Sequence, residues 1–103
     1  MTDRSDAIAG LGPVHPGEVL SEDVFPETGL TKTEFAKRLG MSREALHNIF
    51  TGKSAVTPFV ALKLGRLLGT SPEMWLNLQQ AYDLAMVRGE KGEEIDKVER
   101  LAA

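Results

Sequence analysis

The 103-residue sequence contains no cysteine, which excludes both a disulfide framework and thiolate chemistry. It also lacks any run of apolar residues long enough to span a bilayer, and nothing in it resembles a signal peptide. We therefore expect a soluble, cytoplasmic protein with no membrane partner. A chain of this length should form one domain with a modest hydrophobic core.

Residues for catalysis or metal binding are scarce as well. The two histidines, His15 and His47, fall on separate predicted elements and lack the spacing of metal ligands. Catalysis needs a nucleophile, or a paired acid and base, in a pocket, and the adjacent Glu93 and Glu94 are most simply a solvated helix start. We therefore predict no enzyme activity, no metal, no cofactor and no small-molecule substrate.

No stretch of the sequence has the pattern of a β-strand. Instead, apolar residues recur at helical spacing between residues that start or stop helices. A first helix is expected to begin around Pro16 and to end at Pro26 and Gly29, and later helices start at Thr57-Pro58 and Ser71-Pro72. With two helices between them, these segments predict an all-α fold, a compact bundle of five helices.

The two ends of the chain are predicted to differ from this bundle. Two glycines and a proline interrupt residues 1–14, so we expect a flexible N-terminal arm there. Residues 15–88 should form the domain. Two further glycines loosen the chain at the start of residues 89–103, which are predicted to form an additional C-terminal helix. Its apolar residues are Ile95, Val98 and Leu101.

The chain is organised around two short helices between Thr31 and Phe50. Thr31 can cap the first helix, and Glu34 can reach back to the N–H of that cap, which makes a capping box. Gly40 is placed to end this helix, and Ser42 is placed to cap the next one. Two short helices that meet across a tight glycine turn are typical of a helix-turn-helix.

The polar face of the second helix is predicted to contact DNA bases. A recognition helix places its N-terminal residues against base edges in the major groove. Arginine can form two hydrogen bonds to guanine, and asparagine two to adenine. An ordinary solvated helix face would have the same polar character. The predicted base-reading residues are Ser42, Arg43, Glu44, His47 and Asn48.

Basic residues are concentrated around this motif, although the net charge of the chain is −3. Residues 31–66 hold seven basic and two acidic residues, whereas residues 1–30 and 67–103 carry net charges of −5 and −3. Phosphate contacts need such positive charge, and the acidic ends suggest a second, basic partner. For each single residue a plain solvated loop is an equal alternative. The predicted phosphate contacts are Thr31, Lys32, Thr33, Lys53 and Ser54.

The helix that begins at Pro72 is unusually apolar. One stripe runs along Trp75, Leu78, Tyr82 and Ala85, and other apolar residues spread beyond it. A helix with apolar groups around most of its circumference must be covered on two sides. We expect the core of the domain to cover one side and a second subunit to cover the other. The alternative is that the C-terminal helix covers it within the chain. The predicted dimer-interface residues are Trp75, Leu78, Gln79 and Tyr82.

Two sequence motifs resemble the HigA family of antitoxins, which belongs to the Xre/Cro-like group and is also called the virulence-associated protein I family. They are H-P-G-E-V-L, starting at His15, and L-G-R-L-L-G-T-S-P-E-M-W-L-N-L-Q-Q-A-Y-D-L, ending at Leu84. The helix-turn-helix alone would indicate only the superfamily. Its combination with these two flanking motifs is much more specific.

The resemblance implies a lambda-repressor-like helix-turn-helix fold and the function of an antitoxin in a type II toxin-antitoxin module. Such a protein binds and neutralises a HigB-like toxin, a RelE-like ribonuclease that cleaves messenger RNA, and as a homodimer represses its own operon at double-stranded operator DNA. It also implies that Ser42–Phe50 is the recognition helix and that the helix Trp75–Tyr82 contributes the dimer surface. Two alternatives remain: a solitary Xre-family transcription regulator without a toxin, and an interaction protein without DNA affinity.

Overall fold

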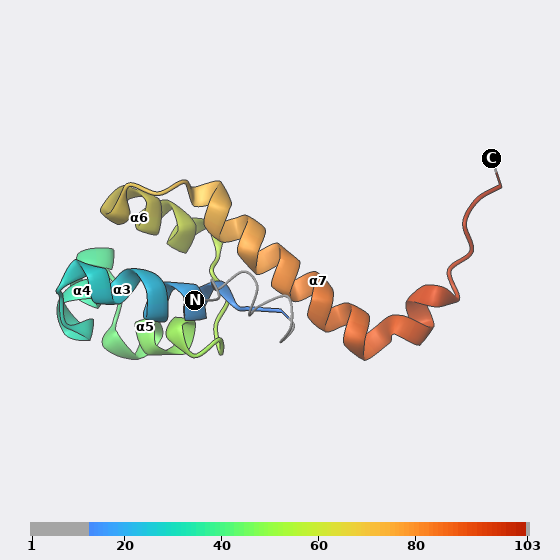
Figure 1. Cartoon of the computed structure of the whole chain (residues 1–103), viewed down its shortest axis with the longest axis horizontal. Coiled ribbons are helices and arrows are strands. Elements are labelled where there is room, and N and C mark those ends of the chain that lie inside the picture. The colour runs from blue at the N-terminus through green and yellow to red at the C-terminus, as the bar shows by residue number, and fades with distance from the viewer. Residues whose placement is uncertain (1–12, 103) are drawn as a thin grey trace, which may run out of the picture.

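The structure is a computed structural model and describes residues 13–102 (Figure 1). Every regular element in this range is a helix, which confirms the predicted all-α fold. The first three elements are continuous along the chain, so the described residues form five helical segments. The elements are α2 (Pro16–Val19), the π-helical turn η1 (Leu20–Val24), α3 (Phe25–Thr28), α4 (Lys32–Leu39), α5 (Arg43–Phe50), α6 (Pro58–Leu68) and α7 (Pro72–Asp96).

The first helical segment runs through Pro26 instead of stopping there. Proline has no N–H to donate, and its ring clashes with the carbonyl four residues earlier in an α-helix. Directly before Pro26 the helix widens into the π turn η1, where the Phe25 N–H donates to the Leu20 carbonyl five residues back. The segment then continues to Thr28 and ends at Gly29, whose φ of 69° lies in the left-handed region. Only the predicted exit at Gly29 is therefore found.

The hydrophobic core lies where the first segment, α4, α5, α6 and the start of α7 meet. Ala36 of α4 is buried at the centre, a position where its small side chain leaves room for neighbouring helices. Phe25 packs edge-on against Phe35, with ring centroids 5.4 Å apart, and lies 5.3 Å from the ring of Phe50. The first segment and the two central helices are thus held together by one aromatic cluster. The other buried core residues are Leu20, Leu39, Leu46, Ile49, Val56, Ala61, Leu64 and Trp75.

Helix α7 is the longest element and gives the molecule its elongated shape, with extents of 54 × 35 × 24 Å. Its first half packs against α6 and α2, and its second half projects away from the other helices (Figure 1). The helix continues through Gly89 and Gly92 to Asp96, with a kink at Lys91. The predicted additional C-terminal helix therefore corresponds to the short helical piece after this kink, which ends at Asp96 and does not include Val98 and Leu101.

The two predicted chain ends have different outcomes. Residues 97–102 follow α7 without forming a helix, and Val98 and Leu101 are 78% and 92% exposed. Of the predicted N-terminal arm, residues 1–12 lie outside the described residues. None of the helices in the part that the structure describes is both long enough and apolar enough to cross a membrane.

Candidate nucleic-acid interface

The turn between α4 and α5 is built from backbone hydrogen bonds. The Gly40 N–H donates to the Lys37 carbonyl and the Met41 N–H donates to the Ala36 carbonyl, both at 3.0 Å. This pair of bonds is the Schellman motif, and it needs the left-handed conformation that Gly40 adopts at a φ of 70°. The Ser42 hydroxyl then accepts from the Ala45 N–H at 3.0 Å and starts α5. The predicted helix-turn-helix is confirmed.

The start of α4 has the predicted cap in a modified form. The Thr31 hydroxyl accepts from the Glu34 N–H at 3.1 Å, as expected. However, the Glu34 carboxylate accepts a hydrogen bond from the Thr31 hydroxyl, also at 3.1 Å, where the capping box would bring it to the Thr31 N–H. Thr31 and Thr33 are exposed and Lys32 is half-buried. The first-turn N–H groups of a helix point outward along its axis and can meet a phosphate.

The recognition face of α5 is accessible. Arg43, Glu44 and His47 are exposed and Asn48 is half-buried, whereas the opposite face is buried in the core. The same helix therefore uses one face to hold the fold and leaves the other for a partner. Ser42, the cap of this helix, is exposed beside that second face.

Lys32 joins the recognition face although it belongs to α4. A shallow hollow of about 450 Å³ is lined by Lys32, Arg43, Glu44 and His47. The Lys32 ammonium also lies 5.9 Å from the ring centroid of Phe50, at the other end of α5. The structure thus brings a predicted phosphate contact and three predicted base readers onto one surface.

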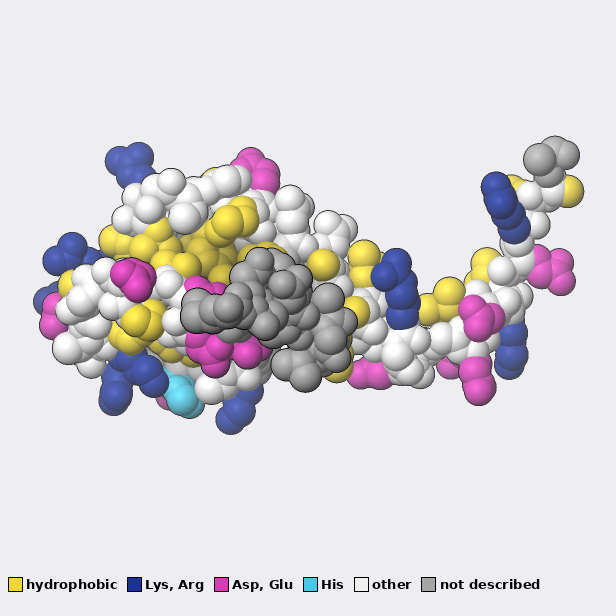
Figure 2. Space-filling model, in the orientation of Figure 1, with side chains coloured by type: hydrophobic (Ala, Val, Ile, Leu, Met, Phe, Trp, Pro, Cys, Tyr) yellow, Lys and Arg dark blue, Asp and Glu magenta, His cyan; other side chains and the backbone are white. Residues whose placement is uncertain are grey.

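The loop after α5 is tied to the end of that helix. The Ser54 N–H donates to the Asn48 carbonyl at 3.0 Å, and the Thr51 hydroxyl donates to the His47 carbonyl at 3.0 Å. These bonds fix Lys53, which is exposed, at the C-terminal end of the recognition helix. The predicted phosphate contacts consequently form two groups, one at the start of α4 and one after α5. In Figure 2, Lys and Arg side chains project around the end of the molecule formed by α4, α5 and α6.

Two of the four predicted dimer residues lie inside the protomer, which corrects the prediction for them. Trp75 is 0% exposed and its indole N–H donates to the Thr70 hydroxyl at 2.8 Å. Gln79 is 6% exposed, and its side-chain oxygen accepts from the buried Val56 N–H at 2.8 Å. Both side chains therefore make their contacts within the chain and offer almost no surface to a second subunit.

The other two predicted dimer residues do reach the surface. Leu78 and Tyr82 are half-buried and belong to an apolar hollow of about 270 Å³ on α7. Ala81 and Ala85 lie on the same side of the helix and line this hollow as well. The apolar stripe of α7 is therefore divided between the core and an accessible face. The remaining lining residues are Pro13, Val14 and Val19.

His15 caps the start of α2 and packs against α7. Its Nδ1 accepts from the Gly17 N–H at 2.9 Å at the start of α2, and its ring packs edge-on against Tyr82, with centroids 5.0 Å apart. Burial lowers the pKa of His15 below its ordinary value of 6.5, against the weaker opposing effect of the Asp83 and Glu18 carboxylates. His15 thus connects α2 to α7 in its neutral form.

The described residues contain no group of three or more His, Asp or Glu side chains arranged to hold a metal ion. The chemistry of this surface is instead that of polar recognition, with an exposed helix face, two groups of hydrogen-bond donors around it, and positive charge. The fold and this surface define a DNA-binding helix-turn-helix protein.

Comparisons with known proteins identify the family. The sequence profile of the helix-turn-helix family matches residues 27–75. Antitoxin HigA-1 of Vibrio cholerae is 37% identical over 86% of this chain and 84% of that protein. The chain belongs to the HigA antitoxin family, whose members are DNA-binding transcription regulators and not enzymes.

Two solved structures agree with this assignment. The Pseudomonas aeruginosa antitoxin HigA, solved with the higBA promoter, has a TM-score of 0.83 and 30% identity, covering 88% of this chain and 100% of its own. The antitoxin GraA, solved in complex with its operator, has a TM-score of 0.81 and 40% identity, covering 89% of this chain and 94% of its own. The predicted family and fold are confirmed.

Proposed function

We propose that this protein is the antitoxin of a type II toxin-antitoxin module and that, as a dimer, it represses its own operon by binding operator DNA. The observation that supports this most strongly is the accessible polar face of α5, which is flanked by basic residues. The opposite face of the same helix is buried and anchors it in the core. Two relatives with the same fold are solved with operator or promoter DNA.

In this proposal α5 enters the major groove. The Arg43 side chain can form two hydrogen bonds to guanine, and the Asn48 side chain can do the same with adenine. Ser42, Glu44 and His47 lie beside them and complete the base-reading face. Thr31, Lys32 and Thr33 contact phosphates ahead of the recognition helix, and Lys53 and Ser54 contact phosphates behind it.

The dimer forms through the accessible part of α7. Leu78 and Tyr82 line an apolar hollow, and the small side chains of Ala81 and Ala85 allow a second helix to approach closely. A two-fold dimer repeats the same surface on both subunits. Its two recognition helices then meet half-sites about one DNA turn apart, roughly 34 Å, or a multiple of that spacing.

The toxin partner in this proposal is a HigB-like ribonuclease. The charge of the chain supports a basic partner, because residues 1–30 and 67–103 carry net charges of −5 and −3. This protein would neutralise the toxin by binding it directly. Solitary transcription regulation without a toxin is the alternative.

Co-expression with the small open reading frame beside this gene, followed by a gel shift with the promoter, tests the proposal. We expect a basic protein to co-purify, its toxicity to be suppressed, and the promoter fragment to shift specifically. A specific shift with neither a co-purifying partner nor suppressed toxicity would favour the solitary regulator. Equal binding to promoter and random DNA would contradict the repressor function.

A further inference from the structure

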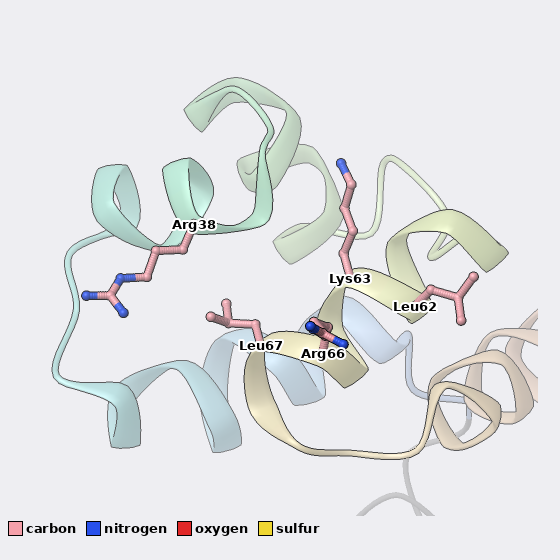
Figure 3. A pocket seen from close by; sticks show the side chains of 5 residues that line it. All are labelled: Arg38, Leu62, Lys63, Arg66 and Leu67. Carbon is pink, nitrogen blue, oxygen red and sulfur yellow. The ribbon is translucent and has the colours of Figure 1, made fainter.

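A second hollow lies outside the surface assigned to DNA. It has a volume of about 450 Å³ and lies between α4 and α6 (Figure 3). Arg38 comes from α4, whereas the other lining side chains come from α6, which has no acidic residue. We refer to this hollow as the α4/α6 groove. It is lined by Arg38, Leu62, Lys63, Arg66 and Leu67.

The α4/α6 groove combines positive charge with exposed apolar surface. Leu62 is 60% exposed and Leu67 is half-buried. Next to it, Phe59 is 67% exposed, with the Lys63 ammonium 4.1 Å from the centroid of its ring. Exposed leucine and phenylalanine side chains that lie beside cations are suited to a ligand that is both acidic and apolar.

Lys63 has a structural role that would exist without any ligand. A Cβ added to Gly40 would come within 3.7 Å of the Lys63 ammonium, so this cation lies over the C-terminal end of α4. Positive charge is favourable at that end of a helix. Arg38 and Arg66, which are both exposed, are therefore the informative cations of the groove.

The end of this same chain has the complementary composition. Residues 90–102, which we call the acidic tail, hold five acidic and three basic residues. Three apolar side chains recur in it at intervals of three, and all are exposed: Ile95 at 45%, Val98 at 78% and Leu101 at 92%. In Figure 1 this part of the chain stands away from the other helices. Its apolar side chains are thus available to a second molecule.

We propose that the acidic tail of one copy docks in the α4/α6 groove of a second copy. The apolar side chains of the tail would cover Leu62 and Leu67, and its carboxylates would face Arg38 and Arg66. Both surfaces then lose exposed apolar area, which favours association. This inference deepens the dimer of the proposed function and rests on it.

The lengths along α7 favour a second copy over the same chain. From Tyr82 to the kink at Lys91 helix α7 extends roughly 14 Å, and from Tyr82 back to Pro72 roughly 15 Å, at 1.5 Å per residue. If two α7 helices pair antiparallel around Tyr82, each tail therefore begins near the start of the partner's α7. The partner's α6 leads into that start through the short linker 69–71, so the groove is close by. Within one chain, α7 carries the tail away from the groove (Figure 1).

Disulfide trapping between two preparations tests this contact directly, because the natural chain has no cysteine. One preparation carries Leu101→Cys in the tail, and an affinity-tagged one carries Leu62→Cys in the groove. Mixing them under mild oxidation should give a cross-linked species of two chains. The matched control pairs Leu101→Cys with Thr51→Cys, an exposed position after α5 that lies outside the groove. Equal cross-linking of the two pairs would overturn the proposal.

Sedimentation equilibrium supplies a second readout that does not depend on cysteine. The double variant Val98→Ser with Leu101→Ser should raise the dimer dissociation constant about tenfold, the effect expected when roughly one apolar side chain is no longer buried. Arg66→Glu, measured separately, should raise the constant by a similar factor. All three side chains are exposed, so the protomer should keep its fold, which circular dichroism checks. Lys37→Glu makes the same charge change on α4 outside the groove and should leave the constant unchanged. If Val98→Ser with Leu101→Ser also leaves it unchanged, the proposal fails.

The outcomes separate this inference from the dimer itself. A natural chain that stays monomeric at micromolar concentration would refute both the dimer and the docked tail. If the chain is dimeric but Leu101→Cys cross-links to Leu62→Cys no more than to Thr51→Cys, the docked tail alone is refuted. A chain with both substitutions that closes its disulfide internally at high dilution would show that the tail folds back on its own groove, which also contradicts docking on a second copy.

Discussion

The side-chain oxygen of Gln79 accepts a hydrogen bond from the buried Val56 N–H at 2.8 Å. This bond joins α7 to the loop that leads from the recognition helix into α6. The Gln79 amide nitrogen donates in turn to the Asp83 carboxylate at 2.9 Å, which fixes the orientation of the amide. A residue twenty-three positions away in sequence therefore determines how the loop after α5 is held.

Gln79→Leu should destabilise the fold, because it leaves the buried Val56 N–H without an acceptor. Such an unsatisfied group costs about 1–3 kcal/mol in the free energy of unfolding. Gln80→Leu, at the exposed neighbouring position, is the matched control and should stay within about 0.5 kcal/mol of the natural chain. Urea denaturation measures both. Equal stability of the two variants would mean that the bond contributes nothing.

Arg43→Ala and Asn48→Ala should reduce operator selectivity without unfolding the protein. Each lost pair of hydrogen bonds to a base should cost about 1–3 kcal/mol of operator affinity. Affinity for random DNA should change much less, because it depends on phosphate contacts. Fluorescence anisotropy with both DNAs makes the comparison. A parallel loss on operator and random DNA would assign these residues to the phosphates instead.

Lys53→Ala should weaken binding to every DNA sequence alike. Each phosphate contact contributes about 0.9 to the slope of log affinity against log salt concentration, so the slope should decrease by about that amount. Lys97→Ala removes an equally exposed lysine beyond the end of α7 and serves as the control. A slope that matches the natural chain would remove Lys53 from the phosphate contacts.

The protomer should lose stability as the pH falls below about 6.5. Burial lowers the pKa of His15 in the folded state, so the unfolded chain binds more protons between that lowered value and 6.5. Protonation of Nδ1 would also remove the acceptor for the Gly17 N–H. The stabilising contribution is complete above pH 6.5 and decreases as the pH falls through the folded-state pKa.

His15→Asn provides the control for this pH effect, because asparagine can also cap a helix and does not titrate. Urea denaturation between pH 8 and pH 5.5 should show a smaller decrease in stability for this variant than for the natural chain. An identical pH dependence of the two proteins would exclude His15 as its source.

Leu78→Asp should convert the dimer to a monomer while the domain stays folded. The substitution places a charge in the apolar surface that two α7 helices would share, and burying an unpaired charge is strongly unfavourable. Asn77→Asp introduces the same charge at the adjacent exposed position and should leave the dimer intact. Analytical ultracentrifugation distinguishes the two. A dimeric Leu78→Asp variant would move the interface off this face of α7.

Much of the fold could be predicted from the sequence because its boundaries are set locally. Thr31, Ser42, Thr57 and Ser71 each cap a helix with a hydrogen bond to the N–H three residues on. These bonds involve neighbouring residues only, so the residue types reveal them. The left-handed Gly40 follows from the same local chemistry.

The errors concern features that depend on tertiary contacts. Trp75 and Gln79 point into the core, but the sequence of an apolar helix does not say which of its faces the rest of the chain covers. The amide of Gln79 would suggest an exposed position, and its partner Val56 is far away in sequence. Helix α7 runs on through Gly89 and kinks at Lys91, and the glycines alone do not show at which residue the chain bends.

A quantitative binding titration of the natural chain with its promoter and with random DNA of equal length tests the central claim most directly. Footprinting of the same complex adds the geometry. We expect promoter affinity at least about a thousandfold above that for random DNA, and protection of two half-sites about one DNA turn apart or a multiple of it. Equal affinity for both DNAs, or protection of one isolated half-site, would contradict a dimeric repressor that reads its operator through α5.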